Sequence, residues 1–300
     1  MKKIVFYFIH FILISFLWAC ENKNNANIRI HTTKDDFGRT LQLPVKIDRI
    51  FSVSPSITEI IYKLGLEKKL VARTIHCNYP LRVLTKKAIE VYPLDIEKLI
   101  LLKPQVVFAL KGFISDENVE KLSKIGIQTY FVECETVQQT IDAHLKIGKV
   151  MDADYVAEIV RDTMTSRLHK FQKKISSSAP KLKALVVISP QNLYVFGAQN
   201  YVSDMLYYAN LENVVPKSNP HQFPTLSVEQ ILQLNPDLII YPASKTDKSH
   251  NSLAYFHPAL RKLKAIEAKN EYFIDEDIIV RPGPRIIEGI EKLSQIKPQN

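Results

Sequence analysis

The sequence predicts an α/β protein with two Rossmann-like lobes, whose mostly parallel sheets are joined by a long helix. One observation is a repeat: "LDIEKLILLKPQVVF" (94–108) returns as "LSVEQILQLNPDLII" (226–240), with Leu, Glu, Leu and Pro each recurring 132 residues later. A second is the alternation of strand-like and helix-like segments in both halves, which is typical of parallel sheets covered by helices. A third is a run of apolar residues at helical spacing between the halves.

The N-terminal half begins with a predicted hairpin. The segment "IRIHTTKDDFGRTLQLP" (28–44) predicts two short strands around a turn at residues 36–38. The run "RIFSVS" (49–54) predicts a buried strand that Pro55 ends. A helix should follow, beginning with a capping box between Ser56 and Glu59 and stopping at Gly65.

Each copy of the repeat predicts a short helix that leads into a buried strand. Asp95 and Ser227 are good N-cap residues, and the Glu two positions later suits the positive end of the helix dipole. Pro104 and Pro236 disfavour helical geometry in the residue before them, so both helices should end there. An apolar, strand-forming run follows each proline, and a further helix and strand follow in each half.

The middle of the chain predicts connecting helices. Residues 136–175 carry apolar side chains at i, i+4 spacing, with Gly148 and the run 152–154 dividing a first helix from a longer second one. We expect these helices to pack across both lobes. The predicted domains are therefore an N-terminal lobe (28–135), the connecting helices (136–178) and a C-terminal lobe (179–300).

The N-terminus predicts export and lipidation. Residues 1–19 combine two lysines with an apolar run, which is typical of a signal peptide. The following "LWAC" is similar to a bacterial lipobox, which implies cleavage before Cys20 and acylation of that residue. Residues 20–27 then form a lipidated, polar tether. The expected location is the cell envelope, periplasmic or extracytoplasmic, with the protein held at a membrane by its lipid.

Composition and motifs exclude several function classes. The formal net charge of +9 is scattered, without a basic stripe and interleaved aromatics, so nucleic acid is not a predicted partner. The chain has no Gly-x-Ser-x-Gly, no phosphate-binding glycine-rich loop and no Cys-x-x-Cys, so we predict no enzyme. Cys77 and Cys134 are compatible with a disulfide in an oxidising compartment, but two cysteines do not establish one.

The motifs together resemble a family of transport proteins. The motifs that carry the resemblance are the repeated cap, Glu, "LxP" and strand, the "SVSPSITE" stretch (52–59), the "NYP" loop (78–80), the central helix and "RPGPRIIEGIEKL" (281–293). The chain resembles substrate-binding proteins of ATP-driven importers for vitamin B12, iron–siderophore chelates and haem. The resemblance covers nearly the whole mature chain. It implies the class III substrate-binding fold, no intrinsic cofactor, a cobalt or iron chelate as ligand, and an ABC permease dimer with its ATPase as partners.

The resemblance also implies roles for individual residues. Glu97 and Glu229 match the glutamates that dock onto permease arginines, one from each lobe, and a Glu at a helix start is well held for such a contact. His76, Tyr92, Tyr194 and Phe223 match ligand-facing positions. Aromatic walls suit a flat corrin or a chelate shell. Arg281 and Arg285 flank a "PGP" turn and are candidates for a ligand carboxylate or phosphate.

Two features leave the ligand open. The single Trp lies in the signal peptide, so tryptophans expected around vitamin B12 are missing, and another corrinoid, a siderophore or haem remains possible. Haem would want an axial His or Tyr, which His76, Tyr92 or Tyr194 could supply. A zinc or manganese receptor is the other alternative; the mature histidines form no close cluster, although metal ligands can converge from distant positions, and we predict no metal site.

Overall fold

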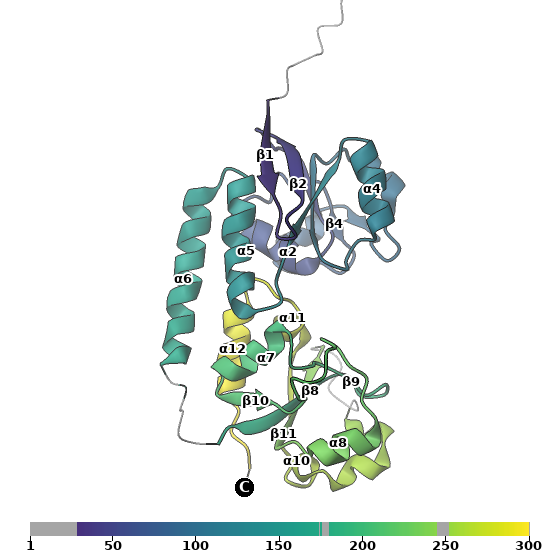
Figure 1. Ribbon diagram of the computed structural model, residues 1–300, viewed down its shortest axis with the longest axis vertical. Coiled ribbons are helices and arrows are strands. Elements are labelled where there is room, and N and C mark those ends of the chain that lie inside the picture. The colour runs from purple at the N-terminus through teal and green to yellow at the C-terminus, as the bar shows by residue number, and fades with distance from the viewer. Residues whose placement is uncertain (1–28, 174, 176–179, 245–251, 300) are drawn as a thin grey trace, which may run out of the picture.

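The computed structural model describes residues 29–173, 175, 180–244 and 252–299. The predicted signal peptide, Cys20 and most of the tether lie outside this part of the chain. Figure 1 shows two α/β halves, one above the other, with two long antiparallel helices along one side. Within the described residues, none of the helices has both the length and the apolar content needed to cross a membrane.

The N-terminal lobe is built on a parallel sheet with the order β3-β6-β7, flanked by a hairpin and a small strand pair. The hairpin of β1 and β2 confirms the predicted strands around residues 36–38. The strands are β1 (Ile30–Lys34), β2 (Thr40–Pro44), β3 (Ile50–Ser52), β4 (Arg73–Thr74), β5 (Ala88–Ile89), β6 (Val106–Leu110) and β7 (Gln128–Val132). The helices are α2 (Pro55–Lys63), η1 (Leu81–Thr85), α3 (Ile96–Leu101) and α4 (Asp116–Lys124).

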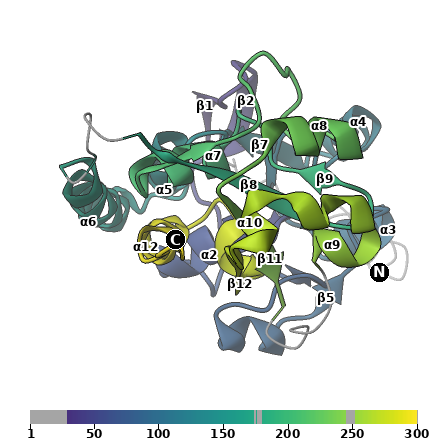
Figure 2. The ribbon, with the colours of Figure 1, turned by 90° about the horizontal axis from the view of Figure 1, so that it is seen from below.

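The C-terminal lobe repeats this plan with the parallel order β10-β8-β11-β12, and β9 pairs antiparallel with β8. Seen from below in Figure 2, helices cover both faces of this sheet. The strands are β8 (Leu182–Ser189), β9 (Tyr194–Val195), β10 (Leu211–Asn213), β11 (Leu238–Ala243) and β12 (Glu271–Asp275). The helices are α7 (Tyr201–Tyr208), α8 (Val228–Leu234), α9 (Leu253–Phe256), η2 (Pro258–Lys262), α10 (Lys264–Glu267), α11 (Glu276–Ile279) and α12 (Ile286–Ser294).

The sequence repeat is also a repeat of backbone geometry. Asp95 and Ser227 cap α3 and α8, each accepting a hydrogen bond from a backbone N–H three residues later. Each helix then ends before a residue with positive φ, Lys103 (46°) and Asn235 (38°), which precedes the proline. The following strands, β6 and β11, begin 132 residues apart, at the offset found in the sequence. The proline rule therefore predicted both helix ends correctly.

The connecting segment forms α5 (Val137–Val150) and α6 (Asp154–Gln172). The prediction that Gly148 helps to divide them is wrong, because Gly148 lies inside α5 and the break falls at Asp152, whose φ is 54°. Gly148 is instead a contact point between the helices. A Cβ atom placed there would lie 2.3 Å from Cβ of Ala157, so only glycine allows this close approach.

The capping box predicted for α2 is also wrong. The helix begins at Pro55, two residues earlier than a Ser56 cap implies, because the fixed φ of proline suits the first helical position. Ser54 is the N-cap, and its hydroxyl accepts a hydrogen bond from the Ile57 N–H at 3.3 Å. Glu59 is thereby freed from a capping role and turns inward, where its exposed fraction is 3%.

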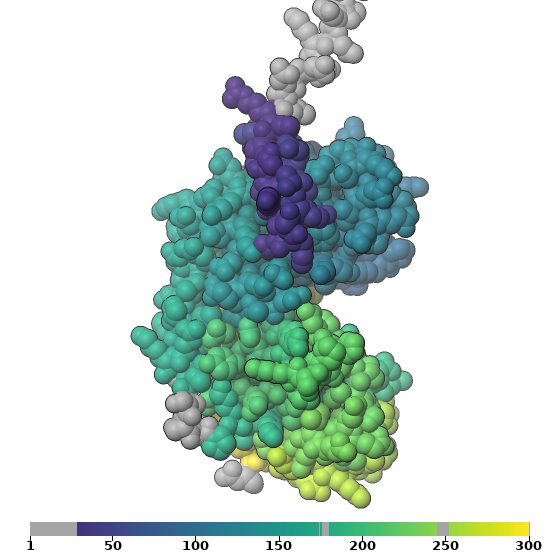
Figure 3. Space-filling view, viewed as in Figure 1, coloured from purple at the N-terminus to yellow at the C-terminus, as the bar shows by residue number. Residues whose placement is uncertain are grey.

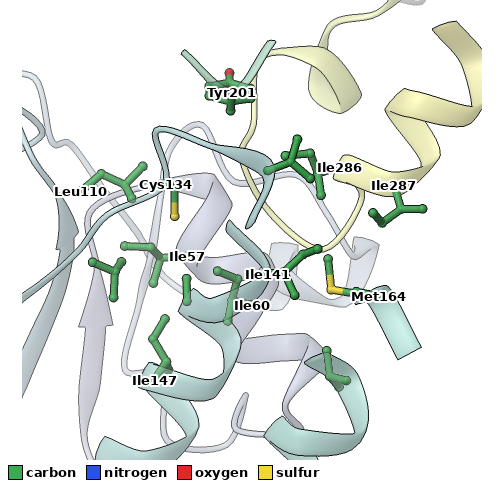
Figure 4. Close-up of a cluster of buried hydrophobic side chains, with 14 of the residues drawn as sticks. Ile57, Ile60, Leu110, Cys134, Ile141, Ile147, Met164, Tyr201, Ile286 and Ile287 are labelled. Carbon is green, nitrogen blue, oxygen red and sulfur yellow. The ribbon is translucent and has the colours of Figure 1, made fainter. Parts of the chain in front are cut away.

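The two lobes share a hydrophobic core on one side and are separated by a hollow on the other. Figure 3 shows the hollow between the upper and lower halves of the surface. The close-up in Figure 4 shows the shared core, in which side chains of α2, α5, α6, α7 and α12 meet. Among them are Ile57, Ile141, Met164, Tyr201 and Ile286. The lobes are therefore joined by continuous packing as well as by the connecting helices.

Candidate functional site

A pocket of about 390 Å³ lies between the lobes, within the size range of small-ligand sites. Both lobes contribute to it, chiefly through loops that follow parallel strands, which is where open α/β sheets place ligands. Its lining consists of Phe37, Pro55, Ser56, His76, Tyr92, Leu110, Lys111, Phe113, Val132, Glu133, Cys134, Glu135, Asn200, Tyr201, Gln222, Phe223, Val280, Arg281 and Pro282.

The N-terminal wall of the pocket carries a row of three rings. The ring centroids of His76 and Tyr92 are 6.2 Å apart, and those of Tyr92 and Phe113 are also 6.2 Å apart. Tyr92 is 54% exposed, so its ring is available to a ligand in the hollow. Partial burial raises the pKa of its phenol, which therefore stays neutral at ordinary pH.

The C-terminal wall presents Phe223, which is 38% exposed. Its loop is fixed by hydrogen bonds, because the Gly197 N–H and the Asn200 side chain both donate to the Gln222 carbonyl, at 2.8 and 2.7 Å. Tyr194 lies next to Phe223, with ring centroids 6.3 Å apart, but it is not among the lining residues. Tyr194 therefore packs behind the exposed Phe223 ring instead of facing the pocket.

A largely buried ionic cluster adjoins the pocket through Arg281. Glu59 of α2 accepts two hydrogen bonds from Arg285, at 2.8 and 2.6 Å, and an ion pair from Arg281 at 3.3 Å. Arg281 also contacts Asp277 at 2.6 Å and donates to the Asn78 side chain at 2.6 Å. These five residues, which we call the lobe clasp, connect α2 and the loop after β4 to α11 and the segment between α11 and α12.

The contacts of the lobe clasp limit how far Arg281 and Arg285 can bind a ligand. Arg281 lines the pocket while held on Glu59 and Asp277, whereas Arg285 is outside the lining and its guanidinium lies 4.2 Å from the Tyr79 ring centroid. Burial raises the pKa of the Glu59 carboxyl, and the two arginines oppose that effect. A guanidinium that already makes bidentate contact with a carboxylate has few donors left for a ligand.

Sequence reasoning missed several lining residues. Lys111 and Phe113 directly follow β6, and Glu133, Cys134 and Glu135 directly follow β7. The signal that could have found them is their position just after predicted parallel strands. Cys134 is buried at the base of the pocket, and burial raises the pKa of its thiol to about 12. Cys77 and Cys134 are both free thiols in the structure.

Glu97 and Glu229 lie on the surface, away from the pocket lining. Each is in the first turn of its helix, at matching positions of α3 and α8. Neither has an ion-pair partner within the part of the chain that the structure describes. Hydrogen bonds from its own backbone N–H and from the Ser227 hydroxyl lower the pKa of Glu229, so this carboxylate is charged.

Comparison with known proteins identifies the family. A family model described as "Periplasmic binding protein" matches residues 50–278 of the chain. The chain belongs to this family. The resemblance found in the sequence is thereby confirmed, as is the class III fold of two α/β lobes. Periplasmic binding proteins of this group are transport proteins without an intrinsic cofactor.

Individual relatives span nearly the same length. The "uncharacterized ABC transporter substrate-binding lipoprotein YvrC" of Bacillus subtilis is 27% identical over 270 residues, covering 88% of this chain and 84% of the relative. A vitamin B12-binding protein of Photorhabdus laumondii is 26% identical over 248 residues, covering 82% and 86%. The solved structure of a periplasmic heme-binding protein, HutB of Vibrio cholerae, matches with a TM-score of 0.71 at 20% identity, covering 82% and 97%, which shows the shared fold.

Proposed function

We propose that this periplasmic binding protein is the substrate-binding lipoprotein of an ABC importer and captures a bulky metal chelate, a corrinoid such as cobalamin or an iron–siderophore. The observation that carries the proposal is the pocket between the lobes, whose walls present aromatic rings from both sides. A chelate of this kind has flat or apolar outer surfaces that bury well against such rings. The B12-binding relative supports the corrinoid as the first ligand to test.

The ligand contacts that we propose combine four lining residues with two supporting ones. His76, Tyr92 and Phe223 offer ring faces and edges, and Arg281 lies beside them at the clasp. Tyr194 supports Phe223, and Arg285 holds Glu59, so both act on the ligand through a neighbour. Lys111, Glu133 and Glu135 add both signs of charge to the pocket, which suits a ligand with several polar substituents.

Delivery of the ligand to the permease would use surface carboxylates instead of the aromatic rings of the pocket. Glu97 and Glu229 are charged contact points outside the pocket, and we propose that they dock on arginines of the two permease subunits. The permease and its ATPase then perform transport, so this protein catalyses no reaction. A lipid on Cys20 would keep the protein in the cell envelope, at the extracytoplasmic or periplasmic surface of a membrane, consistent with the lipoprotein relative.

Haem is the second candidate ligand, and a specific observation favours it. His76 and Tyr92, both able to serve as axial ligands to haem iron, stand together in the pocket lining. Zinc or manganese lacks comparable support, because the described residues contain no group of three or more His, Cys, Asp and Glu side chains placed to hold an ion. We therefore propose haem, and not a bare metal ion, as the alternative.

The deciding experiment offers the purified protein an equimolar mixture of cyanocobalamin, ferric siderophores and haem. Native mass spectrometry then identifies what remains bound after gel filtration, and visible absorption reports any haem ligation. Retention of the corrinoid or a siderophore supports the main proposal. Retention of haem, with an absorption change lost in His76→Ala or Tyr92→Ala, replaces it with the alternative. Failure to retain any of the three would contradict chelate binding.

A further inference from the structure

Helices α3 and α8 each expose an apolar residue where a polar one would be expected. In both, one residue points into the core of its lobe: Leu99 and Ile231 are each 0% exposed and stand 132 positions apart. The next residue in each helix faces outward, and it is again apolar, with Ile100 38% exposed and Leu232 36% exposed. The outward apolar position has therefore been kept in both copies of the repeat.

These apolar residues lie beside the two surface glutamates. Ile100 is three residues after Glu97, and Leu232 is three residues after Glu229, a spacing that places side chains on the same face of a helix. Each helix consequently presents a carboxylate and an aliphatic side chain together. In α3 the apolar surface extends to Leu101, which is 78% exposed. Figure 2 shows both α3 and α8 on the side of the molecule away from α6.

An aliphatic neighbour changes what a surface carboxylate can contribute. An exposed ion pair in water contributes little, because solvent screens it. Side chains that exclude water around a charged contact strengthen it, as in protein interfaces where a desolvated centre carries most of the binding energy. The combination on α3 and α8 is therefore suited to an interface with a cationic group that sits next to an apolar surface.

We infer that each lobe docks through a two-part contact, Glu97 with Ile100 and Glu229 with Leu232, and that the occupant is the pair of permease subunits. This inference rests on the proposed function. Two copies of one patch on one chain match a partner that presents one surface twice, as two identical subunits do. Each subunit would supply an arginine beside an apolar hollow.

Charge argues against a second copy of this chain as the occupant. Each patch contains one glutamate, so any pairing of patches between two copies of the chain would bring carboxylate against carboxylate. Neither Glu97 nor Glu229 has an ion-pair partner among the described residues. Like charges facing each other across an interface cost free energy. A permease subunit that presents an arginine, as proposed above, would offer the opposite sign.

The test measures binding of the ligand-loaded protein to its permease–ATPase complex in nanodiscs. The variants are Ile100→Ser, Leu232→Ser and the two combined, with both glutamates intact. The matched control is Ile159→Ser, because Ile159 is 49% exposed on α6, away from both patches. We expect each docking substitution to weaken binding about tenfold and the pair about a hundredfold. The control should bind like the wild type.

A second set of variants, Glu97→Gln and Glu229→Gln, separates this inference from the function on which it rests. If the Gln variants lose binding and the Ser variants do not, the apolar half of the contact is refuted and the docking role stands. If neither set loses binding, the docking role fails and this inference fails with it. Loss from only one lobe, or dimerisation of the free protein that the Ser variants abolish, would overturn the two-point contact with the permease.

Discussion

Replacing Glu59 by Gln is the most informative change to the fold, because it removes the charge on which the lobe clasp is built. The side chain of Glu59 is 2% exposed, and those of Arg281 and Arg285 are 12% and 13% exposed. Loss of the carboxylate leaves two nearly buried guanidinium groups, for which Asp277 is the remaining ion-pair partner among the described residues. Breaking a buried ion pair in this way costs about 3–5 kcal/mol. That is a large part of the 5–15 kcal/mol that typically stabilises a domain.

The assay is equilibrium unfolding in urea, followed by circular dichroism, for wild type, Glu59→Gln, Arg285→Gln and the double variant. The single substitutions should each lower the free energy of unfolding by several kcal/mol. The double variant should lose clearly less than the sum, because the partners interact directly. Glu117→Gln serves as the control, since it removes a fully exposed helix ion pair with Lys121 and should leave stability almost unchanged. A loss below about 1 kcal/mol for Glu59→Gln would refute the view that the clasp holds the lobes together.

Three further predictions concern the pocket, pH and the thiols. Tyr92→Ala and Phe223→Ala should each weaken binding of the retained chelate about tenfold or more in calorimetry, because each removes an exposed ring of the pocket wall. The control Tyr155→Ala, at a residue 77% exposed on α6, should bind like the wild type. If the two ring variants also bind with wild-type affinity, these rings are not part of the site. Burial lowers the pKa of His144 to about 4, so stability present above pH 6.5 should be lost as pH falls toward 4. The loss should reach about 2 kcal/mol at pH 5 relative to pH 7. His144→Leu should lack this dependence in urea titrations, and an unchanged pH profile would contradict the assignment. Cys134, with its raised pKa, should resist iodoacetamide at pH 8 until the protein is unfolded; rapid labelling of the native protein would show an accessible thiolate.

The repeat was predictable from sequence because its signals are local. A cap, a buried residue one turn later and a proline specify each short helix and its exit into a strand, and the structure reproduces all three at the same offset. The pocket was predictable in part. His76, Tyr92 and Phe223 were expected there from the resemblance, and Arg281 from its place beside the PGP turn. All four are lining residues, whereas Tyr194 and Arg285 are not.

What could not be predicted depends on contacts distant in sequence. Glu59 resembles a capping residue when only its neighbours are considered, but its true partners lie 222 and 226 positions further along the chain. For the same reason Arg285 resembled a free ligand-binding cation. No local pattern distinguishes a guanidinium that faces a cleft from one that neutralises a buried acid. That distinction requires knowing which elements meet, and it appears only once α2 and the segment before α12 are seen side by side.

The shared core and the lobe clasp together limit how the protein can bind. Ile57, Ile141 and Ile286 pack in one cluster that crosses from one lobe to the other, so wide opening would expose apolar surface. It would also separate Glu59 from its arginines, at the cost estimated above. The pocket walls are thus largely formed before the ligand arrives, and less free energy is spent on ordering them during binding. If the protein delivers its ligand as proposed above, its loaded and empty states have to differ by small shifts. Arg281, which touches both the pocket and the clasp, is positioned to carry such a shift from the ligand to the packing between the lobes.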